Sequence, residues 1–94
     1  MARLSDDEIE QRLAGGDWLL EGDSLVRDFV CTGFKSAMTL ANAVADAANE
    51  ANHHPDILVH GYKHVRLTLS THSEGGITDN DFALAQAIDG IEPV

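Results

Sequence analysis

The sequence is poor in cysteine, proline and basic residues, and each shortage excludes a class of protein. Its one cysteine among 94 residues cannot close a disulfide within the chain. Eight glycines and two prolines are too few for a collagen-like or linker composition. No apolar run approaches the roughly 18 residues that a membrane-spanning helix needs. The apolar fraction of 44% is that of an ordinary globular protein.

Basic residues are also outnumbered, with 6 Lys and Arg against 16 Asp and Glu and a net charge of −10. A surface this negative repels phosphate backbones and anionic lipids, so we expect neither a nucleic-acid partner nor a membrane partner. No apolar stretch follows Arg3, as it would in a secretory signal. We therefore expect a cytoplasmic protein in which residues 1–94 form one domain. A core of this size is modest, which favours self-association.

Residues 1–31 predict a helix followed by two short strands. Ser5 and Glu8 have the spacing of a capping box at the start of a helix, and the glycines at positions 15–16 end it. Strands are expected at residues 18–20 and 25–31, with a turn between them. This part of the chain should therefore form a helix and a hairpin.

The strongest helix pattern covers residues 36–51, which are rich in alanine and contain neither Gly nor Pro. Spacings of three and four predict a buried stripe that includes Phe34, Met38, Ala41, Ala45 and Ala48. Pro55 disfavours the helical conformation at the residue before it, so the helix should end around residues 52–54.

Two more strands are expected at residues 57–60 and 62–72, and the second alternates between apolar and polar side chains. Thr78 and Asp81 have capping-box spacing and should open a last helix that Gly90 ends. The order is α-β-β-α-β-β-α. Two hairpins around a helix predict an α+β fold, with one four-stranded antiparallel sheet and helices packed on one face.

Histidines are the best candidates for chemistry, because imidazole gains or loses a proton near neutral pH. His53 and His54 lie at the expected helix exit, and His72 lies at the expected strand end. Plain structural alternatives remain open: the first two could cap helix carbonyls, and His72 could be a surface residue. We interpret His60 and His64 as surface residues.

A metal site is the main rival interpretation of the histidines. Two adjacent histidines and a third 18 positions later could bind zinc, but the chain has no HExxH motif and no cysteine pair. We therefore predict no metal, and we expect Cys31 to be a buried packing residue. Asp81 has an ordinary interpretation as a helix cap. From the residues alone, the chain is a small acidic α+β domain with a candidate histidine site.

A longer pattern of residues is more specific. The run from Asn52 to Ile57 contains two histidines before a proline, Tyr62 lies ten residues before His72, and Asp81 lies nine residues after it. Together with the segments 69–72, 75–78 and 81–83, this pattern resembles the pterin-4a-carbinolamine dehydratase family. The resemblance spans residues 49–88.

The resemblance implies a four-stranded antiparallel sheet backed by helices, assembled as a homodimer or homotetramer. It implies loss of water from a 4a-hydroxytetrahydropterin to give quinonoid dihydropterin, without metal or organic cofactor. His53 and His72 would be the acid–base pair, with His54 binding and orienting the pterin. The other implied pocket residues are Asn52, Pro55, Thr71, Ser73 and Asp81.

One position departs from the family pattern. The family usually carries a carboxylate four residues before the first histidine, where this chain has Asn49. If the helix continues, Asn49 and His53 lie at i and i+4 on one face, whereas Glu50 is rotated by about 100°. The departure leaves room for a second function class. In this second class, the chain would be a module that binds a pterin or a protein partner, as a dimerisation factor or coactivator does. It could also be linked to molybdopterin metabolism.

Overall fold

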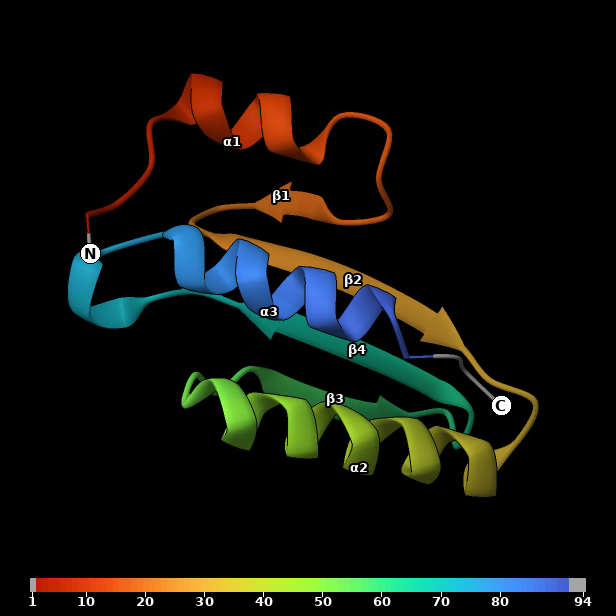
Figure 1. Cartoon of the computed structure of the whole chain (residues 1–94). Coiled ribbons are helices and arrows are strands. Elements are labelled where there is room, and N and C mark those ends of the chain that lie inside the picture. The colour runs from red at the N-terminus through yellow and green to blue at the C-terminus, as the bar shows by residue number, and fades with distance from the viewer. Residues whose placement is uncertain (1, 92–94) are drawn as a thin grey trace.

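The computed structural model describes residues 2–91 (Figure 1). Its elements follow the expected order, with one additional 3-10 helix, η1. In chain order they are α1 (Asp6–Leu13), β1 (Leu19–Glu21), β2 (Ser24–Val30), α2 (Phe34–Ala51), β3 (Asp56–His60), β4 (His64–Leu69), η1 (His72–Glu74) and α3 (Asp79–Asp89). None of these helices is long and apolar enough to cross a bilayer.

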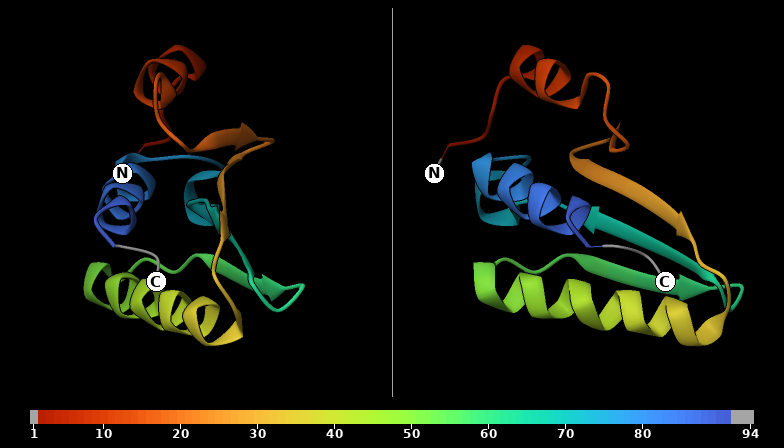
Figure 2. Two further views of the ribbon diagram at one scale, coloured as in Figure 1. Left: turned by 90° about the vertical axis from the view of Figure 1, so that its right-hand side faces the viewer. Right: turned by 45° about the vertical axis from the view of Figure 1, so that its right-hand side comes forward.

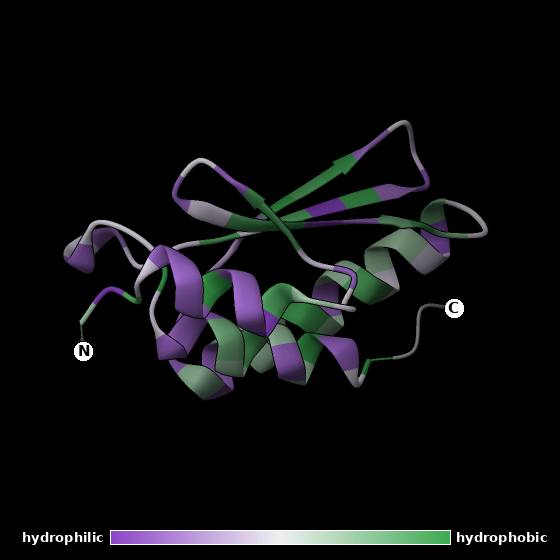
Figure 3. Ribbon diagram, turned by 90° about the horizontal axis from the view of Figure 1, so that it is seen from above, coloured by the Kyte–Doolittle hydropathy of each residue, from purple (hydrophilic) through white to green (hydrophobic). Residues whose placement is uncertain are grey.

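The four strands form one antiparallel sheet in the order β1-β2-β4-β3. The helices lie on one side of this sheet, and the other face is open (Figures 2 and 3). The predicted α+β fold and the predicted packing of helices on one face are therefore confirmed. Because β4 lies between β2 and β3, it is flanked on both sides and fixes the registers of both neighbours.

The core lies between the helices and the covered face of the sheet. Strand β4 alternates as predicted, with Val65, Leu67 and Leu69 fully buried. Leu25 and Phe29 of β2 pair with Leu69 and Val65 and point to the same side. The helices contribute Leu40, Val44, Leu84 and Ile88, among others. Cys31 is buried, as expected.

Helix α2 begins two residues earlier than predicted, because Ser36 is inside the first turn and not before it. The Ser36 hydroxyl accepts from the backbone N–H of Gly33 at 3.1 Å, which makes Gly33 the cap and Phe34 the first helical residue. The predicted stripe was wrong at its start. Phe34 and Met38 are 59% and 38% exposed, and the buried positions are Ala37, Leu40, Ala41, Val44 and Ala48.

The predicted strand 62–72 is also too long, since β4 covers only His64–Leu69. At its start, Gly61 and Tyr62 both adopt positive φ, 53° and 55°, and so form the turn of the hairpin. At its end, Thr71 pairs only with Gly76 in an isolated bridge. His72 therefore opens the 3-10 turn η1 and does not end a strand.

A helix cap and two tertiary pairs fix the outer helices. The Ser5 hydroxyl accepts from the Glu8 N–H at 3.2 Å, as predicted for α1. Trp18 is buried next to the short strand β1, and its indole N–H donates to Asp89 at 2.8 Å. Arg27 of β2 pairs with the same carboxylate. This network joins the end of α3 to the edge of the sheet.

The assignment of the buried face of α2 can be tested by replacing single side chains with alanine. Leu40 is 1% exposed and Met38 is 38% exposed, and the two residue types have similar helix propensities. We expect Leu40→Ala to lower the free energy of unfolding by about 2–5 kcal/mol, because it leaves a cavity in the core. Met38→Ala should cost less than about 1 kcal/mol. Urea unfolding followed by circular dichroism measures both, and equal costs would show that the helix faces are wrongly assigned.

Candidate active site

The predicted site residues come from three connections at one end of the molecule. The end of α2, the end of β4 with η1, and the start of α3 meet there (Figure 1). The β3–β4 turn, with His60 and His64, lies at the opposite end of the same hairpin. The fold therefore separates the five histidines into a group of three and a group of two.

The end of α2 turns the chain so that His53 and His54 leave the helix. Asn52 adopts a left-handed conformation with φ 51° and donates its N–H to the Asn49 carbonyl at 3.2 Å. The His53 N–H donates to the Ala48 carbonyl at 3.1 Å. These two bonds form a Schellman motif, which ends a helix. The expectation that Asn49 and His53 share a helical face is therefore wrong.

The partner of His53 is Asp81, 28 residues away in sequence. Nε2 of His53 lies 2.5 Å from Oδ1 of Asp81. The Asp81 side chain is fully buried, and the imidazole of His53 is 14% exposed. A buried carboxylate thus holds a ring that still reaches the surface, which is an arrangement suited to proton transfer.

Asp81 is held in turn by two threonines. Its Oδ2 accepts from the Thr71 hydroxyl at 2.8 Å and from the backbone N–H of Thr78 at 2.9 Å. The two threonine hydroxyls lie 2.9 Å apart. Thr78 is fully buried, and within residues 2–91 no buried side-chain nitrogen or oxygen lacks a hydrogen-bond partner. Asp81 therefore serves as the predicted helix cap and contacts His53 as well.

His54 has a different partner. Its Nε2 lies 3.1 Å from Oδ1 of Asn49, and both side chains are exposed. Glu50 is also exposed and follows Asn49 around the helix. The position at which this chain departs from the family pattern is therefore next to the second histidine.

The remaining predicted residues surround this group less tightly. His72 and Ser73 are exposed on η1, directly after Thr71. In the described part of the chain, the His72 ring has no hydrogen bond or ion pair. Asn52 is exposed and Pro55 is half-buried. The structure thus joins His53 and Thr71 through Asp81 and leaves Asn52, His72 and Ser73 exposed.

The two other histidines stack on each other. The rings of His60 and His64 are 5.2 Å apart and nearly parallel, on opposite strands of the hairpin. His60 is exposed as expected, whereas His64 is half-buried.

Sequence reasoning missed Thr78 as part of the site and missed the partner of Asn49. The capping-box pattern gave the first signal, because it placed the Thr78 N–H on the Asp81 carboxylate. It gave no indication that the other carboxylate oxygen would reach His53. The second contact depends on the Schellman turn, which the sequence did not locate to the residue.

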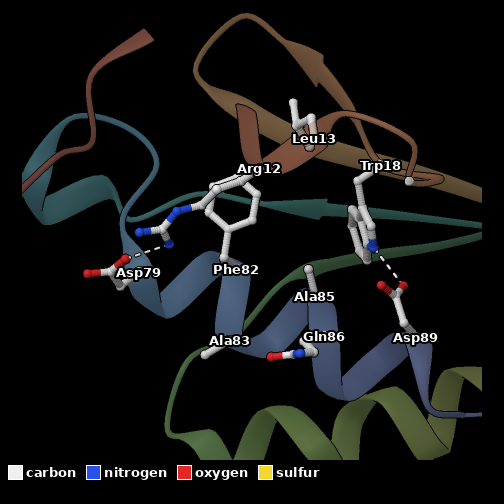
Figure 4. A pocket seen from close by; sticks show the side chains of 10 residues that line it. Arg12, Leu13, Trp18, Asp79, Phe82, Ala83, Ala85, Gln86 and Asp89 are labelled. Carbon is white, nitrogen blue, oxygen red and sulfur yellow. Dashed lines mark hydrogen bonds and ion pairs between the residues drawn. The ribbon is translucent and has the colours of Figure 1, made fainter. Parts of the chain in front are cut away.

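A separate cavity of about 460 Å³ lies between α1 and α3, away from the three histidines (Figure 4). Arg12 pairs with Asp79 at 2.6 Å across it and stacks over the ring of Phe82. The hydrogen bond with Asp79 raises the pKa of the Arg12 guanidinium above its ordinary value. These contacts hold α1 against α3, and none of the predicted site residues lines this cavity.

No described segment gathers three or more side chains of the His, Cys, Asp and Glu types in a metal-binding arrangement. His53 already shares its Nε2 with a carboxylate, and His54 faces an amide. Metal independence stays a prediction.

Comparisons with known proteins agree with the pattern. The profile of the family described as pterin 4 alpha carbinolamine dehydratase matches residues 2–91. A protein of Chloroflexus aurantiacus, provisionally named pterin-4-alpha-carbinolamine dehydratase, is 49% identical over 92 residues, covering 97% of this chain and 98% of that protein. One of Thermomicrobium roseum with the same provisional name is 47% identical over 91 residues, covering 94% and 95%.

Solved structures show the same fold. A transcriptional coactivator/pterin dehydratase from Brucella melitensis superposes with a TM-score of 0.84 at 30% identity, covering 93% of this chain and 95% of that one. A pterin dehydratase-like protein described as a RuBisCO assembly factor of the alpha-carboxysome shares the fold, with a TM-score of 0.65 at 23% identity. The superposition covers 80% of this chain and 88% of the assembly factor's chain. By its profile match and its relatives, the chain belongs to the pterin 4 alpha carbinolamine dehydratase family.

Proposed function

We propose that this protein removes water from a 4a-hydroxytetrahydropterin to give quinonoid dihydropterin. The observation that carries the proposal is the pairing of His53 with a fully buried Asp81, beside the turn that presents His72. Family membership supports the reaction class.

The reaction needs only two proton movements. The 4a-hydroxyl receives a proton and leaves as water when the C4a–O bond breaks. The adjacent ring nitrogen, N5, loses its proton, and the electrons of that N–H bond form the C4a=N5 double bond. Positioned acid–base groups accelerate such steps by about 10²–10⁴-fold. Two imidazoles suffice, and no metal or organic cofactor is required by this chemistry.

His53 and His72 are the proposed acid–base pair. His53 is oriented by Asp81, whereas the side chain of His72 is exposed and accessible to a substrate. His54, held by Asn49, is proposed to bind and orient the pterin. Backbone and side-chain groups of four further residues are proposed to line the pocket: Asn52, Pro55, Thr71 and Ser73.

Single substitutions test these roles. We expect His53→Ala and His72→Ala each to lower kcat at least tenfold, because each removes a proton-transfer group. His54→Ala should mainly raise KM, because it removes binding and leaves the chemical step. The assay mixes each protein with 4a-hydroxytetrahydropterin and follows the formation of quinonoid dihydropterin.

His60→Ala is the matched control, since His60 is exposed at the far end of the hairpin. It should leave both constants unchanged. A loss with His60→Ala as large as that with His53→Ala would overturn the assignment. If the wild-type protein binds pterin without turning it over, the binding or protein-partner function applies.

The exchange at position 49 gives a second test. Asn49 faces His54, so a carboxylate at this position would favour the charged form of that imidazole. We expect Asn49→Glu to move the pH dependence of KM toward alkaline pH and to leave the pH dependence of kcat in place. Glu50→Gln, at the neighbouring exposed position, is the control. A shift confined to kcat would show that position 49 acts on His53.

We also propose that the protein is a homodimer or homotetramer. Large apolar side chains are exposed at the end of the molecule opposite the three histidines. Val30 is 67%, Tyr62 61% and Phe34 59% exposed. The Cys31 N–H donates to the Lys63 carbonyl at 2.7 Å, which keeps the end of β2 next to the hairpin turn. Burying this apolar end against another copy would remove it from water.

Phe34→Asp should dissociate the assembly at micromolar concentration. The new carboxylate lies in the first turn of α2, where an acid is compatible with the helix. Leu19→Asp is the control, because Leu19 is 67% exposed on the distant strand β1. Sedimentation equilibrium measures the mass. A monomeric mass for the wild-type protein, or equal dissociation by both variants, would contradict the proposal.

A further inference from the structure

The hydrogen bonds around Asp81 run in one direction only. The backbone N–H of Asn80 donates to Oγ1 of Thr78 at 3.2 Å, and an amide nitrogen cannot accept in return. The Thr71 hydroxyl has a single hydrogen, which goes to Oδ2 of Asp81 at 2.8 Å. The Thr78 hydroxyl must therefore be the donor across the 2.9 Å between the two Oγ1 atoms.

A second fixed donor reaches the same carboxylate oxygen. The backbone N–H of Thr78 donates to Oδ2 at 2.9 Å. Two donors thus point at Oδ2, which leaves no place for a hydrogen on that oxygen. The reverse direction along the hydroxyls would require Oδ2 to donate to Thr71, and a carboxylate oxygen has no hydrogen to donate. Oδ2 is therefore an acceptor of two hydrogen bonds, and only Oδ1 is available to His53.

We propose that Asp81 is a positioning residue that holds His53 in the tautomer with its hydrogen on Nε2, so that Nδ1 is the nitrogen that exchanges a proton with the substrate. Oδ1 lies 2.5 Å from Nε2, and a carboxylate oxygen accepts a hydrogen from that nitrogen. Within residues 2–91, Nδ1 has no hydrogen-bond partner. The second half of the proposal rests on the proposed dehydratase function.

This assignment gives Asp81 a role in the proton transfer without contact with the substrate. When Nδ1 takes a proton from N5, the imidazole becomes positively charged next to a buried carboxylate. When Nδ1 returns a proton, the neutral ring is again in the same tautomer. The aspartate of a Ser-His-Asp triad orients its histidine in the same manner, and its exchange for asparagine there costs about 10⁴-fold in kcat.

Asp81→Asn separates this role from ordinary packing. The amide is almost the same size as the carboxyl group, but its two ends differ. Its carbonyl oxygen must face the two donors from Thr71 and Thr78, because an NH₂ group there would meet two hydrogens. The NH₂ group must then face Nε2 of His53 and donate to it. The variant should therefore move the hydrogen of His53 to Nδ1.

Imidazole nitrogen–proton correlation spectra test the proposal on the protein without substrate, at a pH where the ring is neutral. The wild type should show the His53 hydrogen on Nε2, and Asp81→Asn should show it on Nδ1. The spectrum of His53→Gln assigns the signals. Asp81→Asn should also lower kcat by roughly 10²–10⁴-fold, with less effect on KM.

Asp79→Asn is the matched control, because it makes the same exchange in the same helical turn at an exposed carboxylate. It should leave the tautomer and kcat unchanged. A wild-type spectrum with the hydrogen on Nδ1 would overturn the inference, and this measurement does not depend on a variant that folds. A wild-type protein with the Nε2 hydrogen but no dehydratase activity would refute the proposed function while supporting the tautomer assignment.

Discussion

The buried carboxylate of Asp81 is the contact on which the site depends. It joins three separate connections of the chain: the exit of α2 through His53, the end of β4 through Thr71, and the start of α3 through Thr78. Burying an unpaired carboxylate would cost several kcal/mol. Here both oxygens have hydrogen-bond partners, so burial becomes compatible with stability. The same donors leave Asp81 one orientation, which is what a proton-transfer partner requires.

The fold supplies this arrangement at one end of a rigid sheet. Strand β4 is central and paired on both sides, so the position of Thr71 beyond its end is well fixed. Helix α2 contacts the sheet through small and branched side chains, and its Schellman turn sets the direction of His53. The exposed apolar residues Val30, Phe34 and Tyr62 lie at the opposite end. Self-association there would leave the three histidines accessible to a small ligand.

Periodicity and helix caps predicted the element types and their order, because these are local properties of the sequence. The strand alternation at Val65, Leu67 and Leu69 identified the covered face of β4 correctly. Boundaries were less certain where a cap residue lies inside the helix, as at Ser36, or where left-handed residues make a turn, as at Tyr62. Motif spacing identified the candidate site residues, but it could not predict the hydrogen bonds between residues that are distant in the sequence. The pairing of His53 with Asp81 needed three-dimensional coordinates.

The asparagine at position 49 has a physical explanation in these contacts. A carboxylate at this position would lie beside His54. The imidazole of His53 already contacts a carboxylate, that of Asp81, which is distant in sequence. Positions 49 and 81 therefore contact different histidines in this chain. Loss of charge at position 49 changes the surroundings of the proposed binding histidine and leaves the proposed proton-transfer histidine with its partner. The departure at position 49 thus leaves the contact between His53 and Asp81 in place.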